Sequence, residues 1–221
     1  MNAEATVPAA RLPADWLARL RHGLNKLPEH RPEYWRIGVA PAQLLPDLRA
    51  QLPASLRPAS VLLPISEQRG VPHLLLTLRS PHLRQHAGQI SFPGGSLESS
   101  DADPLATALR EAHEEVGIEA GFVEPLGFLT DHVVMTGFRI TPIVALLRPG
   151  YALHINAAEV AGVFDLPLEM LLDPHSYRRA TRNLRGVDVE LTELHFEGHV
   201  IWGATAGILQ SLREILQEPA P

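Results

Sequence analysis

The chain has 221 residues, of which 45% are apolar and 20% are charged, a balance typical of a globular protein that buries one main core. It contains no cysteine, which excludes disulfide scaffolds, zinc–thiolate sites and thiol nucleophiles, so a bound metal must be held by oxygen or imidazole. The formal net charge of −6 disfavours general nucleic-acid binding. The apolar runs are shorter than the roughly 20 residues that cross a bilayer, so we expect a cytoplasmic protein without membrane or nucleic-acid partners.

Residues 1–56 are expected to form an N-terminal helical extension. Four apolar residues recur there at helical spacing, Trp16, Leu17, Leu20 and Leu24, and a second short helix is expected near residues 44–52. This periodicity is compatible with a segment that covers the sheet, shapes a pocket or forms a homodimer interface. The sequence leaves these alternatives open.

Residues 57–217 are expected to form the main domain. Two apolar runs, 60–66 and 73–78, flank a turn and predict two strands. Further strands are predicted at 126–130, 139–147, 160–166 and within 177–196, and a last helix at 202–216. Mixed strands with few, separated helices predict an α+β or layered α/β/α domain.

The most strongly marked helix is predicted at residues 104–116. Its apolar stripe consists of Leu105, Leu109, Ala112 and Val116. Asp103 can cap the first amides, Pro104 suits the first helical position, and Gly117 suits the left-handed residue after the end. Both ends of this helix are therefore specified locally.

Three carboxylates are predicted on one face of this helix. Glu111, Glu114 and Glu115 fall within an arc of about 100°, opposite the apolar stripe, at 3.6 residues per turn. Such crowding raises the Coulomb energy unless cations are present, and Mg²⁺ and Mn²⁺ prefer oxygen ligands of this kind. An isolated cluster of this type is more often a solvated helix face. Upstream, Gly94 and Gly95 allow the backbone to approach a ligand or metal closely.

The stretch from Gly95 to Ile118 resembles the Nudix box, the loop–helix–loop signature of hydrolases that split a nucleoside diphosphate linked to another group. The matching positions of its REUxEExGU half are Arg110, Glu111, Ala112, Glu114, Glu115, Gly117 and Ile118. The first half is one residue longer than the general box, and its loop acid is either Asp101 or Glu98. We favour Asp101 as the partner of Arg110 that braces the loop. The resemblance implies a Nudix fold, an α/β/α sandwich with a mixed β-sheet between helices.

A second motif narrows the expected substrate. Residues 75–95 resemble the signature that precedes the box in the coenzyme A diphosphatase branch of the family. The residues in register are Leu75, Leu76, Thr77, Arg79, Ser80, Arg84, Gly88, Phe92, Pro93, Gly94 and Gly95. This resemblance implies cleavage of coenzyme A, and of its acyl esters, to adenosine 3',5'-bisphosphate and 4'-phosphopantetheine.

The resemblance also implies roles for the acidic residues. Glu111 and Glu115 would bind Mg²⁺ or Mn²⁺, and Glu114 would be a further ligand or an acceptor for a water. Gly95 would contribute its backbone at the metal. Glu159 would be an additional carboxylate near the metals or the attacking water, with a plain surface acid as the equal alternative.

Basic residues are expected to contact the substrate. Arg79, Arg84 and His86 could contact phosphates, because guanidinium groups suit phosphate geometry and imidazole can donate a hydrogen bond, with Gly94 and Gly95 lining the same site. Another basic cluster, formed by Arg178, Arg179, Arg182 and Arg185, is either a solvated ribbon, which we favour, or a site for the 3'-phosphate.

Three other functions are alternatives to this prediction. The first changes the substrate to ADP-ribose, a dinucleotide or an oxidised nucleoside triphosphate, against which residues 75–95 argue. The second is a non-catalytic ligand sensor. Glu111, Glu114 and Glu115 argue against it, because a pure binding module does not need a metal site of three carboxylates. The third is an allylic diphosphate isomerase, for which the expected catalytic cysteine is missing.

Overall fold

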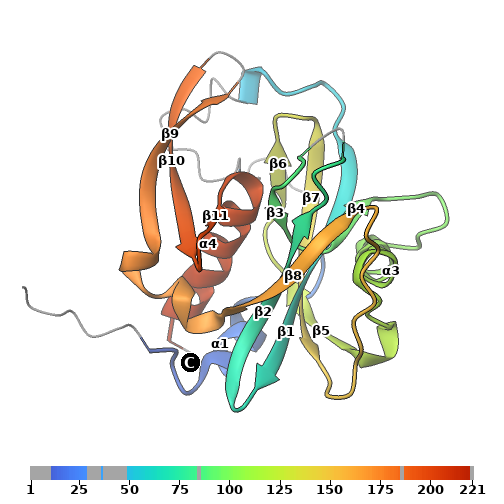
Figure 1. The fold of residues 1–221 in the computed structure, drawn as a ribbon, viewed down its shortest axis with the longest axis vertical. Helices are drawn as coiled ribbons and strands as arrows, with labels where there is room; N and C mark the ends of the chain where they lie inside the picture. The colour runs from blue at the N-terminus through green and yellow to red at the C-terminus, as the bar shows by residue number, and fades with distance from the viewer. Residues whose placement is uncertain (1–10, 29–35, 37–48, 84–85, 185–186, 220–221) are drawn as a thin grey trace, which may run out of the picture.

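The computed structural model describes residues 11–28, 36, 49–83, 86–184 and 187–219 (Figure 1). The helix expected near residues 44–52 lies mostly outside this set, although residues 49 and 50 are helical. Arg84 and Arg185 also lie outside the described residues.

A mixed β-sheet forms the centre of the fold. Its strands are β1 (Arg57–Gln68), β2 (Val71–Arg79), β3 (Ile90–Ser91), β4 (Gly94–Ser96), β5 (Val123–Phe128), β6 (His132–Val134), β7 (Phe138–Leu147) and β8 (Val160–Pro167). The main path runs β3-β2-β1-β7-β5, with β4 paired to β1, β6 to β7 and β8 to β2. β1 and β7 are parallel and the other pairs are antiparallel. The predicted strands are confirmed, most with longer bounds.

Helices cover both faces of this sheet. α3 (Pro104–Val116) packs on one face, where Ala108 and Ala112 join a core with Leu62 and Ile143. α1 (Trp16–Gly23) and α4 (Gly203–Gln217) lie on the other face (Figure 1). β1 has apolar residues on both sides because its two faces support two separate cores. The predicted α/β/α sandwich is therefore confirmed.

The N-terminal helix shares the main core. Leu20 and Leu24 are buried in the same cluster as Leu209 and Leu212 of α4. β1 begins at Arg57 and α4 ends at Gln217, while the division of the chain at residue 56 stays a prediction. No helix in the described part of the chain is both long and apolar enough to cross a membrane.

The segment 177–196 forms a hairpin outside the main sheet. Its strands β9 (Tyr177–Leu184) and β10 (Val187–Phe196) pair with each other, and β10 also pairs with β11 (His199–Ile201), which completes a second, three-stranded sheet beside α4 (Figure 1). The last helix begins at Gly203, and the half-buried Trp202 precedes it as the N-cap residue.

His132 makes folding sensitive to acid. Its side chain is fully buried on β6, where burial lowers its pKa to about 4 from 6.5 and Nδ1 lies 3.0 Å from the carbonyl oxygen of Thr130. Between pH 4 and pH 6.5, His132 is therefore protonated in the unfolded chain and neutral in the folded chain. The contribution of His132 to the free energy of unfolding is expected to fall by about 3 kcal/mol as the pH drops from about 6.5 to about 4.

Urea unfolding at a series of pH values measures this loss. The raised pKa of Glu115 adds an opposite slope to every variant, so the effect of His132 is read as a difference. The free energy of unfolding of the wild-type protein minus that of His132→Asn is expected to fall by about 3 kcal/mol over this pH range, whereas the exposed His22→Asn keeps the wild-type slope. An unchanged slope in the His132 variant would assign the acid sensitivity to other groups.

Candidate active site

The ends of α3 place its carboxylates at fixed positions. The Asp103 carboxylate accepts a hydrogen bond of 2.8 Å from the amide of Ala106, and Pro104 occupies the first helical turn. At the other end Gly117 adopts the left-handed conformation, with φ of 77°, and its amide donates to carbonyl groups of the last turn. The predicted bounds and caps are confirmed, and the helix presents Glu111, Glu114 and Glu115 in a fixed register.

Asp101 braces the loop that precedes α3. It accepts hydrogen bonds of 3.0 Å from Nε and Nη2 of Arg110 and one from the hydroxyl of Thr107. The Arg110 guanidinium lowers the pKa of Asp101 to about 2, so this carboxylate stays charged at neutral pH. Glu98 contacts Asp101 through its backbone: its amide donates to Asp101 Oδ2, and its carbonyl oxygen accepts from the amide of Asp101. The choice of Asp101 over Glu98 is therefore confirmed.

The three carboxylates predicted on one helix face differ widely in their exposure to solvent. The side chain of Glu115 is only 3% exposed, whereas that of Glu114 is 52% exposed. The physical reason is that β4 lies over one side of α3, where the amide of Gly94 donates to Glu115 Oε2 at 3.1 Å. Burial raises the pKa of Glu115 to about 7, and this amide and Arg79 oppose the rise.

Glu111 is intermediate in exposure between Glu115 and Glu114. Its carboxylate accepts a hydrogen bond of 3.0 Å from Arg110 Nη1, which also donates to Glu114 Oε2 at 3.0 Å. Burial raises the pKa of Glu111, and Arg110 counteracts part of the rise. The carboxylate also lies directly against Gly95, where a Cβ atom would overlap it. Glycine at this position is therefore required for Glu111 to lie close to β4.

Glu159 joins the group from the loop before β8. Its charge helps to raise the pKa of both Glu111 and Glu115, which places it within electrostatic reach of both carboxylates. Its Oε1 accepts a hydrogen bond of 3.2 Å from Nδ2 of Asn156. The fold thus brings a distant loop acid to the carboxylates of α3.

Arg79 is the basic residue that faces this group. Its Nη1 lies 3.7 Å from Glu115 Oε1, and its buried Nε has no hydrogen-bond partner among the described residues. It sits at an irregularity in the pairing of β2 with β8. His86 is exposed, and its Nδ1 lies 2.8 Å from Gln89 Oε1. Within the described residues, this side-chain contact does not bring His86 to the carboxylates of α3.

The donor set suits Mg²⁺ or Mn²⁺. Glu111, Glu114, Glu115 and Glu159 offer hard oxygen ligands, and burial of Glu115 without a full counter-charge favours an added cation. Within the described residues no three His, Cys, Asp or Glu side chains already converge as a metal-ligand group. Arg110 instead holds the carboxylates of Glu111 and Glu114, and Arg79 lies near that of Glu115. A bound cation would have to displace these arginines in part.

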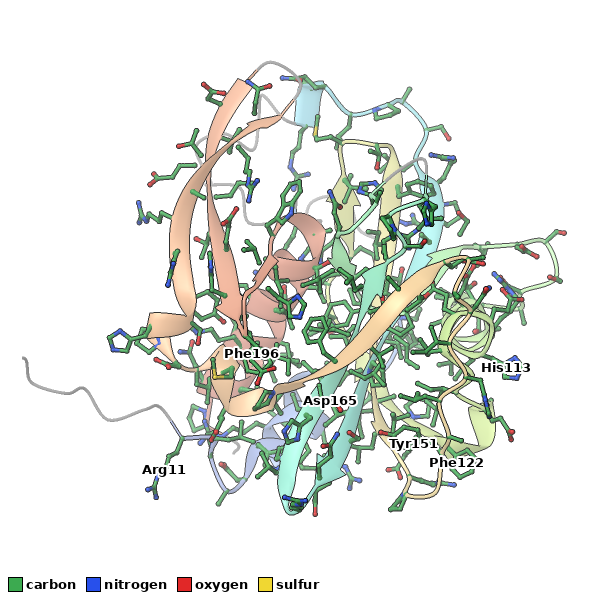
Figure 2. All side chains as sticks on the ribbon, in the orientation of Figure 1. Arg11, His113, Phe122, Tyr151, Asp165 and Phe196 are labelled. Carbon is green, nitrogen blue, oxygen red and sulfur yellow. The ribbon has the colours of Figure 1, made fainter. Side chains whose placement is uncertain are left out.

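Two basic residues of β9, Arg179 and Arg182, form ion pairs with acids of β10. Arg182 contacts the buried Glu193 at 2.6 Å and lies over the ring of Trp202 at 5.0 Å from its centroid. Arg179 pairs with Glu190 at 3.4 Å. These ion pairs favour the basic ribbon over a site for the 3'-phosphate. The side chain of Arg179 is solvated, as predicted, whereas Arg182 is bound to the buried Glu193. His113, between the box carboxylates, is exposed and points away from the sheet (Figure 2).

Asn156 was missed by sequence reasoning. It contacts both Glu159 and the backbone of Glu115, but an asparagine in a polar loop is common. The available signal was an asparagine two residues before Ala158 in a polar loop, the spacing at which asparagine side chains organise turns.

Comparison with known proteins identifies similar chains. A family model described as the NUDIX domain matches residues 56–183. The "Uncharacterized Nudix hydrolase NudL" of Enterobacter sp. (strain 638) is 42% identical over 156 residues, which cover 71% of this chain and 81% of that protein. The protein of the same name from Photorhabdus laumondii is 44% identical over 173 residues, covering 78% of this chain and 92% of that protein.

Among solved structures, the crystal structure of a Nudix hydrolase from M. smegmatis, RenU, is similar with a TM-score of 0.49. It is 20% identical, and the match covers 73% of this chain and 86% of that one.

Proposed function

Because the chain belongs to the Nudix hydrolase family, we propose that it is a metal-dependent diphosphatase that cleaves coenzyme A to adenosine 3',5'-bisphosphate and 4'-phosphopantetheine. Coenzyme A esters are included, because the thiol end lies far from the diphosphate. The observation that carries the substrate assignment is the coenzyme A-type signature at residues 75–95.

The position of this signature supports the assignment. The segment runs through β2 and β3 and ends at Gly94 and Gly95, which contact Glu115 and Glu111. Arg79, at the end of β2 within this segment, faces Glu115. Three residues of the signature, Arg79, Gly94 and Gly95, therefore lie next to the carboxylates of α3.

The proposed mechanism divides the work among a few residues. Glu111 and Glu115 would hold Mg²⁺ or Mn²⁺, with Glu114 and the Gly95 backbone completing the site. The bound cation supplies neutralisation of the diphosphate and activation of the attacking water. Glu159 would accept the proton of that water, and Arg79 would hold a phosphate oxygen through its guanidinium.

Product analysis tests this proposal. Purified protein is incubated with coenzyme A or ADP-ribose in Mg²⁺ or Mn²⁺, and the products are separated by chromatography. Release of adenosine 3',5'-bisphosphate from coenzyme A, with slower turnover of ADP-ribose, is the expected result. Preference for ADP-ribose would overturn the substrate assignment, and turnover of neither would overturn the proposed reaction.

Arg79 is expected to act on substrate binding. Arg79→Gln should raise KM for coenzyme A by about 10- to 100-fold, because a hydrogen bond to a charged group contributes about 1.5–3 kcal/mol. Steady-state kinetics measures the change. Arg179→Gln, which removes an exposed arginine paired with Glu190 on β9, is the matched control and should leave KM unchanged. An equal KM for both variants would exclude Arg79 from the substrate site.

A further inference from the structure

The loop before β8 is connected to the helix that carries the carboxylates. The backbone amide of Asn156 donates to the carbonyl oxygen of Glu115 at 2.9 Å. The amide of the preceding His154 donates to Val116 at 2.9 Å in the same way. The backbone of Asn156 is therefore fixed relative to α3.

The same residue contacts the Glu159 side chain. Asn156 Nδ2 donates to Glu159 Oε1 at 3.2 Å, while Asn156 Oδ1 accepts from the amide of Ala158 at 3.2 Å. The backbone oxygen of Asn156 accepts from the amides of Glu159 and Val160. The side-chain amide of Asn156 thus has two separate roles: its oxygen stabilises the turn, and its nitrogen binds the Glu159 carboxylate.

A donor is needed at this point because Glu159 faces like charge. Glu111 and Glu115 repel its carboxylate, and a half-buried side chain at the start of a strand could otherwise turn toward solvent. The backbone of Glu159 is also held from the other side, since its carbonyl oxygen accepts from the amide of Ser80 at 2.8 Å. What the backbone leaves free is the side-chain rotamer, which the Asn156 amide selects.

We propose that Asn156 is a positioning residue that holds the Glu159 carboxylate beside Glu111 and Glu115 for the hydrolytic step. The inference rests on the proposed function, in which Glu159 acts on the attacking water. A neutral amide suits this task, because it donates a hydrogen bond without adding charge to a site that binds cations and phosphates.

Substitution by aspartate separates the two roles of the amide. Asn156→Asp keeps an oxygen for the amide of Ala158 but loses the donor to Glu159. It is expected to lower kcat by about 10- to 100-fold with little change in KM, as for other residues that orient an active-site group. If Asn156 only shaped the loop, aspartate would retain wild-type kcat and alanine alone would be impaired.

A double-mutant cycle tests whether the effect passes through Glu159. In a Glu159→Gln background, Asn156→Asp is expected to lower kcat by less than about twofold, since the group it positions is already lost. The control is Asn183→Asp, which changes a similar asparagine–carboxylate pair on β9, where Nδ2 donates to Asp188 at 2.7 Å. It should leave kcat unchanged.

Nuclear magnetic resonance gives a readout that needs neither metal nor substrate. The side-chain amide signals of Asn156 are identified by their loss in Asn156→Asp. They are expected to shift in Glu159→Gln but not in Glu218→Gln, an exposed acid at the end of α4 on the other face of the sheet. Unmoved signals, equal losses of kcat in both backgrounds, or full activity of Glu159→Gln would overturn this inference, whereas inactivity of the wild-type protein on coenzyme A would overturn only the substrate assignment.

Discussion

Glu115→Gln is expected to lower kcat on the diphosphate substrate by about three orders of magnitude. A bound cation would stabilise the transition state by several kcal/mol, and each 1.36 kcal/mol of stabilisation corresponds to a factor of ten in rate. Gln keeps an oxygen that can accept from the Gly94 amide, so the packing between α3 and β4 is preserved. The loss therefore reports the missing charge.

The stability of Glu115→Gln is expected to rise or stay constant, although its kcat falls. Glu115 is buried with its pKa raised to about 7, so its charge is unfavourable in the metal-free protein. Thermal unfolding in a chelator is expected to show a Tm equal to or above that of the wild-type protein. Glu119→Gln is the matched control on an exposed acid and should change neither quantity. A kcat near the wild-type value would remove Glu115 from the metal site.

Gly95→Ala is expected to lower kcat by about 100-fold or more while the protein stays folded. The added Cβ would overlap the Glu111 carboxylate, which is the flexible end of a side chain and can rotate away. A displacement of about 1 Å in an active site can reduce the rate by about 100-fold. Calorimetric titration with Mn²⁺ should show weakened binding in parallel with the loss of kcat.

The neighbouring glycine provides the contrast. A Cβ at Gly94 would overlap backbone atoms of Ser60 and Val61 in β1, which cannot rotate away. Gly94→Ala is therefore expected to reduce the free energy of unfolding by about 1–3 kcal/mol or more, measured by urea unfolding. Loss of stability in Gly95→Ala instead, with unchanged Mn²⁺ affinity, would contradict the placement of Glu111.

The strands and helices were largely predictable because their signals are local. The apolar alternation and the turn at Arg69–Gly70 identify β1 and β2, and the Nudix box identifies α3. The hairpin of β9 and β10 was predicted as strands, but its separation from the main sheet depends on contacts with α4 that no local pattern encodes.

The sequence by itself determined α3 and its register. Asp103 and Gly117 act on amides and carbonyls of their own helix, so the position of Glu111, Glu114 and Glu115 along it follows from neighbouring residues. The pairing of Asp101 with Arg110 was also expected, because both belong to one motif.

The tertiary structure decided which carboxylates are buried and what surrounds them. Helical spacing placed Glu114 and Glu115 alike, yet only Glu115 lies beneath β4, because the pairing of β4 with β1 brings the Gly94 amide to it. Glu159 and Asn156 reach the same group because β8 pairs with β2 beside Arg79. Burial and electrostatic environment depend on strand pairing between distant segments, and helical periodicity carries no information about that pairing.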